Sequence, residues 1–330
     1  MLAPVLRLAL AIEVALGLWL GLTIARAFEA PAAWCTIGVP VVVLGVPLAA
    51  TVLSFLVAMP FSHAHESGSR LGLWRGLRWF ACEFVALSAL YVVLQPFERR
   101  FVRSPALEGK RGTARPVILL HGIYCNSASW WSMRRRLDSR RIGPVYTLDV
   151  ESPLSSIGGY AQQLARFIEH VRAATGAERV VLAGHSMGGL VARACIALPG
   201  LAPQVEKLVT LGSPHRGSRH ARLGIGANSR QLEAGSDWLC RLNANPASMA
   251  VPIVSIYSRH DNFIAPQESA ALPGAKLIPL DGVGHLSLLF DSVVGRLLCD
   301  AIEEAEPGVT RLAARTARQT GTGPAAAGHR

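Results

Sequence analysis

The sequence predicts an α/β fold, with a mostly parallel sheet covered by helices on both faces, preceded by an N-terminal transmembrane helical region. Three observations predict this arrangement. From residue 116 onward, short β-branched runs alternate with helical patterns, as in parallel sheets that are buried on both faces. The turn "GHSMGG" at 184–189 lies between such a run and a helical segment. Residues 1–97 contain only nine charged side chains, a composition that suits contact with lipid better than contact with water.

The clearest predicted membrane span is residues 34–61, which contain no charged side chain. This stretch exceeds the ~20 residues that are needed to cross a hydrocarbon core. Pro40 and Pro47 are tolerated in a membrane helix, although we expect them to kink it. Together with two flanking apolar stretches, this span predicts a membrane region over residues 1–97 with two or three transmembrane helices.

The two flanking stretches each contain one acidic residue, Glu13 in residues 8–25 and Glu83 in residues 79–97. The first is either a retained membrane helix or a signal peptide, since small residues follow it at a position suited to cleavage. The span that comes immediately after it favours retention. The second stretch either spans the membrane or lies along its surface. The sequence leaves open these choices and the side of the membrane on which the folded domain lies.

The formal net charge of +11 is concentrated outside the predicted folded domain. Residues 98–115 form a basic linker with six basic and two acidic side chains. Residues 306–330, a predicted disordered tail, add four arginines and one glutamate. Positive charge beside an apolar region is expected for contact with anionic lipid headgroups. We therefore expect a membrane partner and no nucleic-acid partner.

The six cysteines show no CxxC pair and no metal-ligand spacing. Buried thiols are the expected state, and a disulfide among Cys125, Cys195, Cys240 and Cys299 is the alternative. We expect neither a metal nor another cofactor.

The folded domain is predicted over residues 116–305, with helices over 159–174 and 287–304 and a short cap near residues 213–251. The predicted strands are residues 116–120, 144–150, 179–184, 205–212, 251–258 and 275–280. Candidate acyl contacts in the cap, which are equally well explained by packing, are Leu223, Ile225, Leu232, Trp238 and Leu239.

The turn at 184–189 matches the G-x-S-x-G pattern of a nucleophile elbow. Gly184 and Gly188 let the strand and the following helix approach closely, while Ser186 projects from the turn. The competing interpretation is a glycine-rich turn that merely ends a strand, but the strand–turn–helix context favours a nucleophile. We do not expect His185, directly beside the serine, to be the base. A serine hydroxyl is a weak nucleophile until a base takes its proton, so Ser186 needs partners.

The partners are expected later in the chain, in the order acid and then histidine. Asp261 follows the second strand after the nucleophile, and His285 lies in a loop after the last strand. These contexts predict a catalytic triad of Ser186, Asp261 and His285. The less suitable acids, each in the wrong context, are Asp237, Asp281 and Asp291, the last of which is expected to be solvated on a helix.

Donors for the developing oxyanion are expected from two backbone N–H groups. One is that of Met187, immediately after the nucleophile. The other is that of Ile123, which follows a strand ending in His121–Gly122. We expect His121 to shape this loop rather than to transfer protons.

These pieces together resemble the α/β-hydrolase superfamily, and within it bacterial triacylglycerol lipases and related esterases. The matching segments are "VILLHGI", "VVLAGHSMGGLVAR", "KLVTLGSPHRGS", "YSRHDNFIAP" and "GVGHLSLL". The segment "LGSPHRGS" is also similar to lipase-like deacylases of glycolipid anchors. The resemblance implies an α/β-hydrolase fold and hydrolysis of carboxylic esters through an acyl-enzyme, without a metal. It does not cover the first hundred residues.

The favoured function is that of a membrane-anchored serine ester hydrolase acting on lipid or other apolar acyl esters. Two alternatives stay open. An acyltransferase would use the same triad with an alcohol in place of water. A hydrolase-fold binding module would be non-catalytic, which the intact triad disfavours. We expect a multi-pass protein of a bacterial inner membrane.

Overall fold

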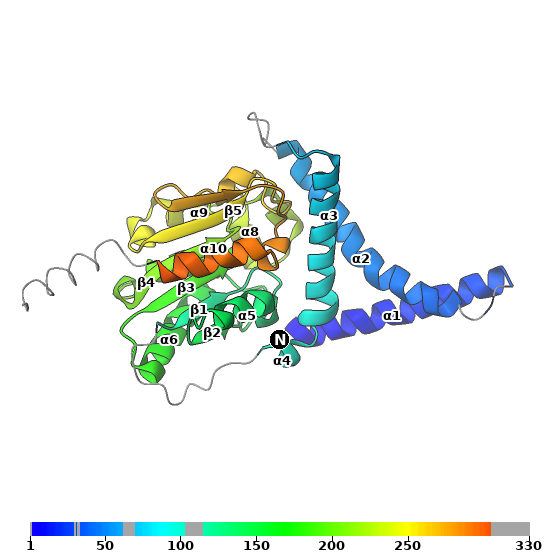
Figure 1. The fold of residues 1–330 in the computed structure, drawn as a ribbon, viewed down its shortest axis with the longest axis horizontal. Coiled ribbons are helices and arrows are strands. Elements are labelled where there is room, and N and C mark those ends of the chain that lie inside the picture. Colours follow the sequence, from blue (N-terminus) through cyan, green and yellow to red (C-terminus); the bar gives the residue numbers. More distant parts are fainter. Residues whose placement is uncertain (1, 30, 32–33, 62–69, 103–114, 305–330) are drawn as a thin grey trace, which may run out of the picture.

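The chain folds into two parts, three long apolar helices and a sheet domain (Figure 1). The computed structural model describes residues 2–29, 31, 34–61, 70–102 and 115–304. Most of the predicted basic linker and all of the predicted disordered tail lie outside these residues.

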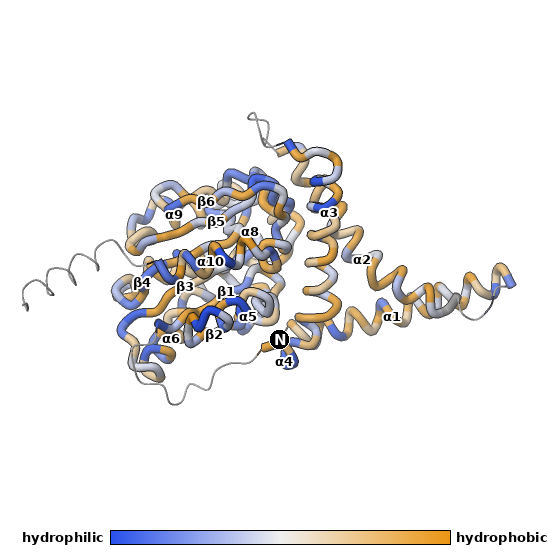
Figure 2. Tube along the Cα trace, in the orientation of Figure 1, coloured by the Kyte–Doolittle hydropathy of each residue, from blue (hydrophilic) through white to orange (hydrophobic). Residues whose placement is uncertain are grey.

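The three N-terminal helices are α1 (Leu2–Ala27), α2 (Trp34–Ala58) and α3 (Leu73–Ser88), the last of which continues as a π-helical segment, Ala89–Leu94. In the described part of the chain, three segments are long and apolar enough to cross a membrane, namely Leu2–Ala27, Thr36–Phe61 and Leu73–Leu94. Apolar residues dominate along them (Figure 2). These helices fit the transmembrane region that the composition predicts. A short helix, α4 (Glu98–Phe101), follows them.

Glycines bring α1 and α2 into close contact. A Cβ atom on Gly38 would lie 2.1 Å from the carbonyl oxygen of Gly17, and one on Gly17 would lie 2.6 Å from the Cα atom of Val39. Small residues commonly mediate such helix pairs in membranes. Pro40 and Pro47 lie inside α2 without ending it. The two helices diverge toward the sheet domain, and α3 runs along that domain (Figure 1).

The sheet has six parallel strands in the order β2-β1-β3-β4-β5-β6. The strands are β1 (Val117–Leu120), β2 (Val145–Leu148), β3 (Val180–His185), β4 (Val205–Leu211), β5 (Ile253–Ser258) and β6 (Lys276–Leu280). Because all strands are parallel, their carboxyl ends meet at one edge of the sheet. The loops after β1, β3 and β5, which contain the predicted site residues, therefore converge there.

Helices cover both faces of the sheet. The bounds of the helices of this domain are α5 (Trp131–Ser139), α6 (Ile157–Thr175), α7 (Met187–Ile196), α8 (Ala227–Leu232), α9 (Asp237–Ala244) and α10 (Ser292–Glu303). One apolar core joins the sheet to α6, α7 and the cap helices α8 and α9. A second core, on the other face, joins it to α5, α10 and the end of α3. The predicted α/β class, with a parallel sheet covered on both faces, is confirmed.

The predicted strands match the observed ones to within two residues at each end. Two details differ from the expectations. Asp291, which we expected to be solvated on a helix, is the N-cap of α10, where its Oδ1 accepts hydrogen bonds from the N–H groups of Val293 and Val294. The five described cysteines are all free thiols, as expected, but Cys82 and Cys240 are exposed rather than buried.

Candidate active site

Ser186 lies between β3 and α7 in a strained turn. Its φ of 54° and ψ of −124° fall in a region that a residue with a Cβ atom rarely adopts. Such strain is typical of the nucleophile elbow, where it exposes the serine hydroxyl. A Cβ atom on Gly184 would lie 2.4 Å from the Gly189 nitrogen, and one on Gly188 would lie 2.2 Å from the Leu120 carbonyl oxygen. Both positions therefore require glycine for the close approach of strand and helix.

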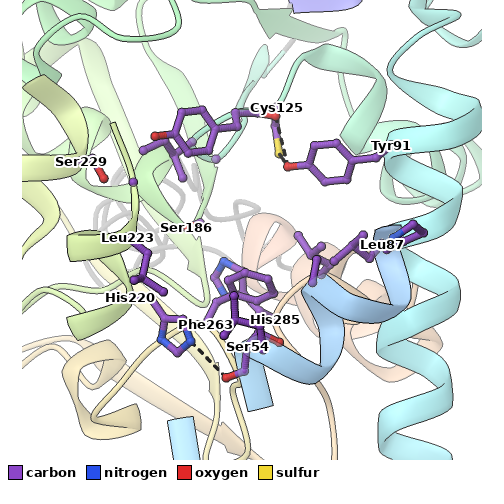
Figure 3. Close-up of a pocket in the computed structure, with 18 of the residues that line it drawn as sticks. Ser54, Leu87, Tyr91, Cys125, Ser186, His220, Leu223, Ser229, Phe263 and His285 are labelled. Carbon is purple, nitrogen blue, oxygen red and sulfur yellow. Dashed lines mark hydrogen bonds between the residues drawn. The ribbon is translucent and has the colours of Figure 1, made fainter. Parts of the chain in front are cut away.

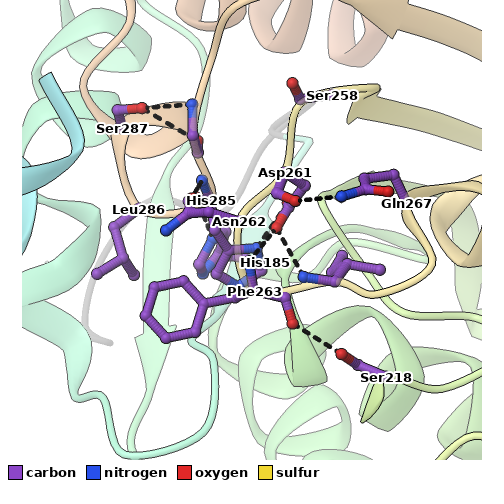
Figure 4. A network of polar contacts seen from close by, with 12 residues as sticks. His185, Ser218, Ser258, Asp261, Asn262, Phe263, Gln267, His285, Leu286 and Ser287 are labelled. Atoms are coloured by element: carbon purple, nitrogen blue, oxygen red, sulfur yellow. Dashed lines mark hydrogen bonds and ion pairs between the residues drawn. The ribbon is translucent and has the colours of Figure 1, made fainter. Parts of the chain in front are cut away.

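His285 and Asp261 form the next part of the site, in a buried polar network (Figure 4). The Nδ1–H group of His285 donates to Oδ2 of Asp261 over 2.8 Å. The other carboxylate oxygen, Oδ1, accepts from the backbone N–H groups of Phe263 at 2.8 Å and Ile264 at 2.9 Å. The carboxylate is thus fixed at both oxygens. When the imidazole is neutral, its proton is therefore on Nδ1 and Nε2 carries none. This is the form that a general base requires.

The surroundings of His285 favour its protonated form. Burial opposes a charge on the imidazole, but the carboxylate of Asp261, its hydrogen bond and the carboxylate of Glu83 raise the pKa of His285 above its usual value. A raised pKa strengthens the base that takes a proton from the nucleophile.

The predicted oxyanion donors lie next to Ser186. Met187 is the first residue of α7, so its N–H group has no acceptor within the helix. The helix N-terminus also favours negative charge at this point. A Cβ atom on Gly122 would lie 3.1 Å from the Cβ atom of Ser186, which places the loop containing Gly122 and Ile123 against the nucleophile. His121 is buried, and its Nδ1–H group donates to the carbonyl oxygen of Gly122 over 2.8 Å, so it shapes this loop.

His185 supports the site through the backbone. Its Nε2–H group donates to the carbonyl oxygen of His285 over 3.1 Å. Burial, with the neighbouring His285, lowers the pKa of His185 well below its usual value. The side chain of His185 is therefore neutral, and its hydrogen bond holds the loop that contains His285. No group of three or more histidine, cysteine, aspartate or glutamate side chains suited to a metal occurs within the described residues.

The chain is similar to parts of several known proteins. A family model described as a PGAP1-like alpha/beta domain matches residues 146–275. Curated proteins named triacylglycerol lipase, from Pseudarthrobacter phenanthrenivorans and Burkholderia plantarii, are each 39% identical to this chain over 118 residues. These matches cover 33% of this chain, and 36% and 32% of the two lipases. The chain thus spans about a third of the length of these relatives.

Solved lipase structures have the same fold. The mature lipase BlEst2 from Bacillus licheniformis has a TM-score of 0.53 at 16% identity, covering 60% of this chain and 96% of that one. Lipase B from Aspergillus fumigatus has a TM-score of 0.55 at 20% identity, covering 66% and 59%. The sheet domain therefore has the α/β-hydrolase fold of these lipases.

A cavity of about 510 Å³ connects the α/β-hydrolase domain with the N-terminal helices (Figure 3). Ser186 and His285 both line it. Of the candidate acyl contacts in the cap, Leu223 and Leu232 line the cavity, whereas Ile225, Trp238 and Leu239 do not. Leu239 is instead buried in the core with which Trp238 packs, and Ile225 is exposed.

Two residues of the apolar helices that contact the catalytic loops were missed by the sequence analysis. Glu83 of α3 is fully buried against the loop that follows His285, and Ser54 of α2 is bonded to Asn262, which follows Asp261. A usable signal exists for Glu83 alone, because an ionisable residue inside an apolar span is by default a functional candidate. Ser54 carries no comparable signal.

Proposed function

We propose that this protein is a membrane-anchored serine ester hydrolase that cleaves carboxylic esters of lipids or other apolar acyl compounds. The observation that carries the proposal is that Ser186 and His285 line one apolar cavity while Nδ1 of His285 is hydrogen-bonded to Asp261. The similarity to proteins named triacylglycerol lipase supports the same reaction class. The three N-terminal helices support a multi-pass anchor in a bacterial inner membrane.

The proposed reaction follows from the positions of these groups. Nε2 of His285 takes the proton of Ser186 as the serine oxygen bonds to the ester carbonyl carbon. The N–H groups of Ile123 and Met187 donate to the resulting oxyanion. The C–O bond to the alcohol then breaks, and the proton on His285 passes to the departing alkoxide. Water, deprotonated by the same histidine, attacks the acyl-enzyme and releases the acid and free Ser186.

A fluorophosphonate probe applied to the purified full-length chain tests this proposal. Such probes bond to a serine only when a base activates it, so we expect labelling of the wild type and none of Ser186→Ala. Ser139→Ala, at an exposed serine of α5, is the matched control and should keep full labelling. Equal labelling of the wild type and Ser186→Ala would exclude Ser186 as the nucleophile.

A further inference from the structure

We propose that the N-terminal helices form the acyl-binding site, so that the substrates are esters of long-chain acids that enter from the membrane. This inference rests on the proposed esterase function and adds the substrate class. In it, α1, α2 and α3 are part of the enzyme's substrate pocket as well as its anchor.

Apolar side chains of the N-terminal helices form part of the cavity wall. All three helices supply apolar side chains to the cavity that contains Ser186. These side chains are Leu6 and Leu10 of α1, Val46 and Leu53 of α2, Leu87 of α3 and Val92 of the π-helical segment. A volume of about 510 Å³ lies within the roughly 300–1,000 Å³ typical of small-molecule sites. An acyl chain whose carbonyl lies at Ser186 therefore has an apolar wall along the cavity.

The position of the cavity is the second argument. It is lined both by α1 and α2 and by the hydrolase domain, toward which the two helices diverge (Figure 1), and the outer surfaces of both helices are rich in exposed apolar side chains. If lipid surrounds these surfaces, an acyl chain can pass from lipid into the cavity between apolar walls. A water-soluble ester of a short acid would gain little from this wall.

Rates along a series of p-nitrophenyl esters, from acetate to palmitate, test the inference in the full-length protein. We expect kcat/KM of the wild type to rise with chain length by up to about fourfold per methylene, the value of burying one such group, until the cavity is filled. Ala50→Trp, which adds an indole to the cavity lining, should remove this gain, so that kcat/KM of the variant no longer rises from acetate to palmitate.

The neighbouring alanine of α2 gives a matched control. Ala49 is exposed like Ala50 but lies outside the cavity lining, so Ala49→Trp should behave as the wild type. Leu53→Ala, which adds no bulk, should lower the rate for palmitate only. Unchanged palmitate rates in Ala50→Trp and Leu53→Ala would overturn the acyl site, whereas a wild type inactive toward every ester would overturn the esterase function itself.

A different observation carries a second inference: we infer that Glu83 is a positioning residue that holds the loop of the catalytic base. Glu83 lies in α3 and has no solvent exposure. Its Oε1 atom accepts from the backbone N–H of Leu286 at 2.9 Å, and Oε2 accepts from that of Ser287 at 2.9 Å. Both oxygens are acceptors, the pattern of an ionised carboxylate.

Gly284, the residue before His285, lies directly against the carboxylate of Glu83. A Cβ atom on Gly284 would lie 2.3 Å from Oε2 of Glu83, so only glycine lets the loop approach the carboxylate this closely. Asn262 adds a second link, because its Oδ1 accepts from the backbone N–H of His285 at 3.0 Å and its Nδ2–H donates to Ser54 Oγ at 2.7 Å. Two apolar helices thus fix the backbone around the base.

The carboxylate also acts on the charge of the base. The titratable groups that face His285 are Asp261, Glu83, His185 and His220. Burial lowers the pKa of His285, but the carboxylates of Asp261 and Glu83 favour the imidazolium form. The net result is a pKa above the usual value. Because the base acts in its neutral form, activity rises as pH increases through this raised pKa. Loss of the Glu83 charge should therefore move the acid limb of the profile to lower pH.

Glu83→Gln tests the positioning role. Glutamine has one acceptor oxygen, so its NH₂ group would oppose one of the two backbone N–H groups. We expect kcat to fall by about 10- to 100-fold, the effect of losing a hydrogen bond to a charged group, with KM little changed and the acid limb displaced to lower pH. Gly284→Ala should also lower kcat, since it separates the same two groups.

Cys82→Ser, at the exposed neighbouring position on α3, is the matched control and should leave kcat and the pH profile unchanged. A purely structural contribution of Glu83 would lower the thermal midpoint without moving the acid limb. An unmoved acid limb and an unchanged kcat in folded Glu83→Gln would overturn the inference.

Discussion

His285→Ala is expected to lower kcat for ester hydrolysis by about 10⁶-fold, the effect of removing the base from a serine hydrolase triad. Without this imidazole, His185 is a poor substitute as the base, because burial lowers its pKa well below the usual value and its Nε2–H group is bonded to the carbonyl oxygen of residue 285. Steady-state hydrolysis of an activated ester by the full-length protein, with correction for the uncatalysed rate, measures the loss.

The double variant His285→Ala/Ser186→Ala distinguishes a shared mechanism from two separate effects. Because base and nucleophile act as one unit, the second substitution should cause almost no further loss. His170→Ala, at an exposed histidine of α6, is the control and should keep the wild-type rate. A loss below tenfold for His285→Ala, or fully multiplicative losses in the double variant, would contradict the assignment of the base.

The sheet was predictable because its signals are local in the sequence. Each strand is a short β-branched run bounded by turns or helices, and burial on both faces makes the run continuously apolar. Strand ends were less predictable, since the last residues of "PVYTLDV" continue as an extended loop without pairing.

The predicted site residues were recognisable for the same reason. Ser186 lies in a motif with a fixed local geometry, and Asp261 and His285 follow strands that a parallel sheet brings to one edge. His285 is hydrogen-bonded to Asp261, and Ser186 and His285 line the same cavity. The role of Asp291 was misjudged because a helix N-cap and a solvated helix position differ by a single residue in the sequence.

Contacts between the apolar helices and the hydrolase domain were beyond the reach of the sequence. Glu83 and Leu286 are 203 residues apart, and Ser54 and Asn262 are 208 residues apart. No periodicity or motif specifies which helix face packs against which loop. The only trace is energetic: a carboxylate in an apolar helix is costly unless it is paired, and here two backbone N–H groups offset that cost.

These contacts give the N-terminal helices a role in the site besides the proposed anchoring. The loop of the base is bonded to α3, and the loop of the acid is bonded to α2 through Asn262. Any shift of these helices relative to the domain would therefore change the position of His285 and the width of the cavity together. The N-terminal helices and the proposed catalytic residues are therefore structurally coupled.

Asp261→Asn is expected to lower kcat by about 10⁴-fold while leaving the fold intact, the effect of imposing the wrong histidine tautomer. The N–H groups of Phe263 and Ile264 require an oxygen at Oδ1. The new NH₂ group must then face Nδ1 of His285 and donate to it. The proton of the imidazole moves to Nε2, which can no longer accept the proton of Ser186.

Two measurements separate this mechanism from loss of structure. The thermal midpoint of Asp261→Asn should stay within a few degrees of the wild type, because the substitution keeps the shape of the side chain and one of its acceptors. Asp281→Asn alters an exposed carboxylate that is paired with Arg259 and should change kcat by less than about twofold. A folded Asp261→Asn with more than a tenth of the wild-type kcat would show that another acid orients His285, since the geometry gives Asp261 sole contact with Nδ1 among the described residues.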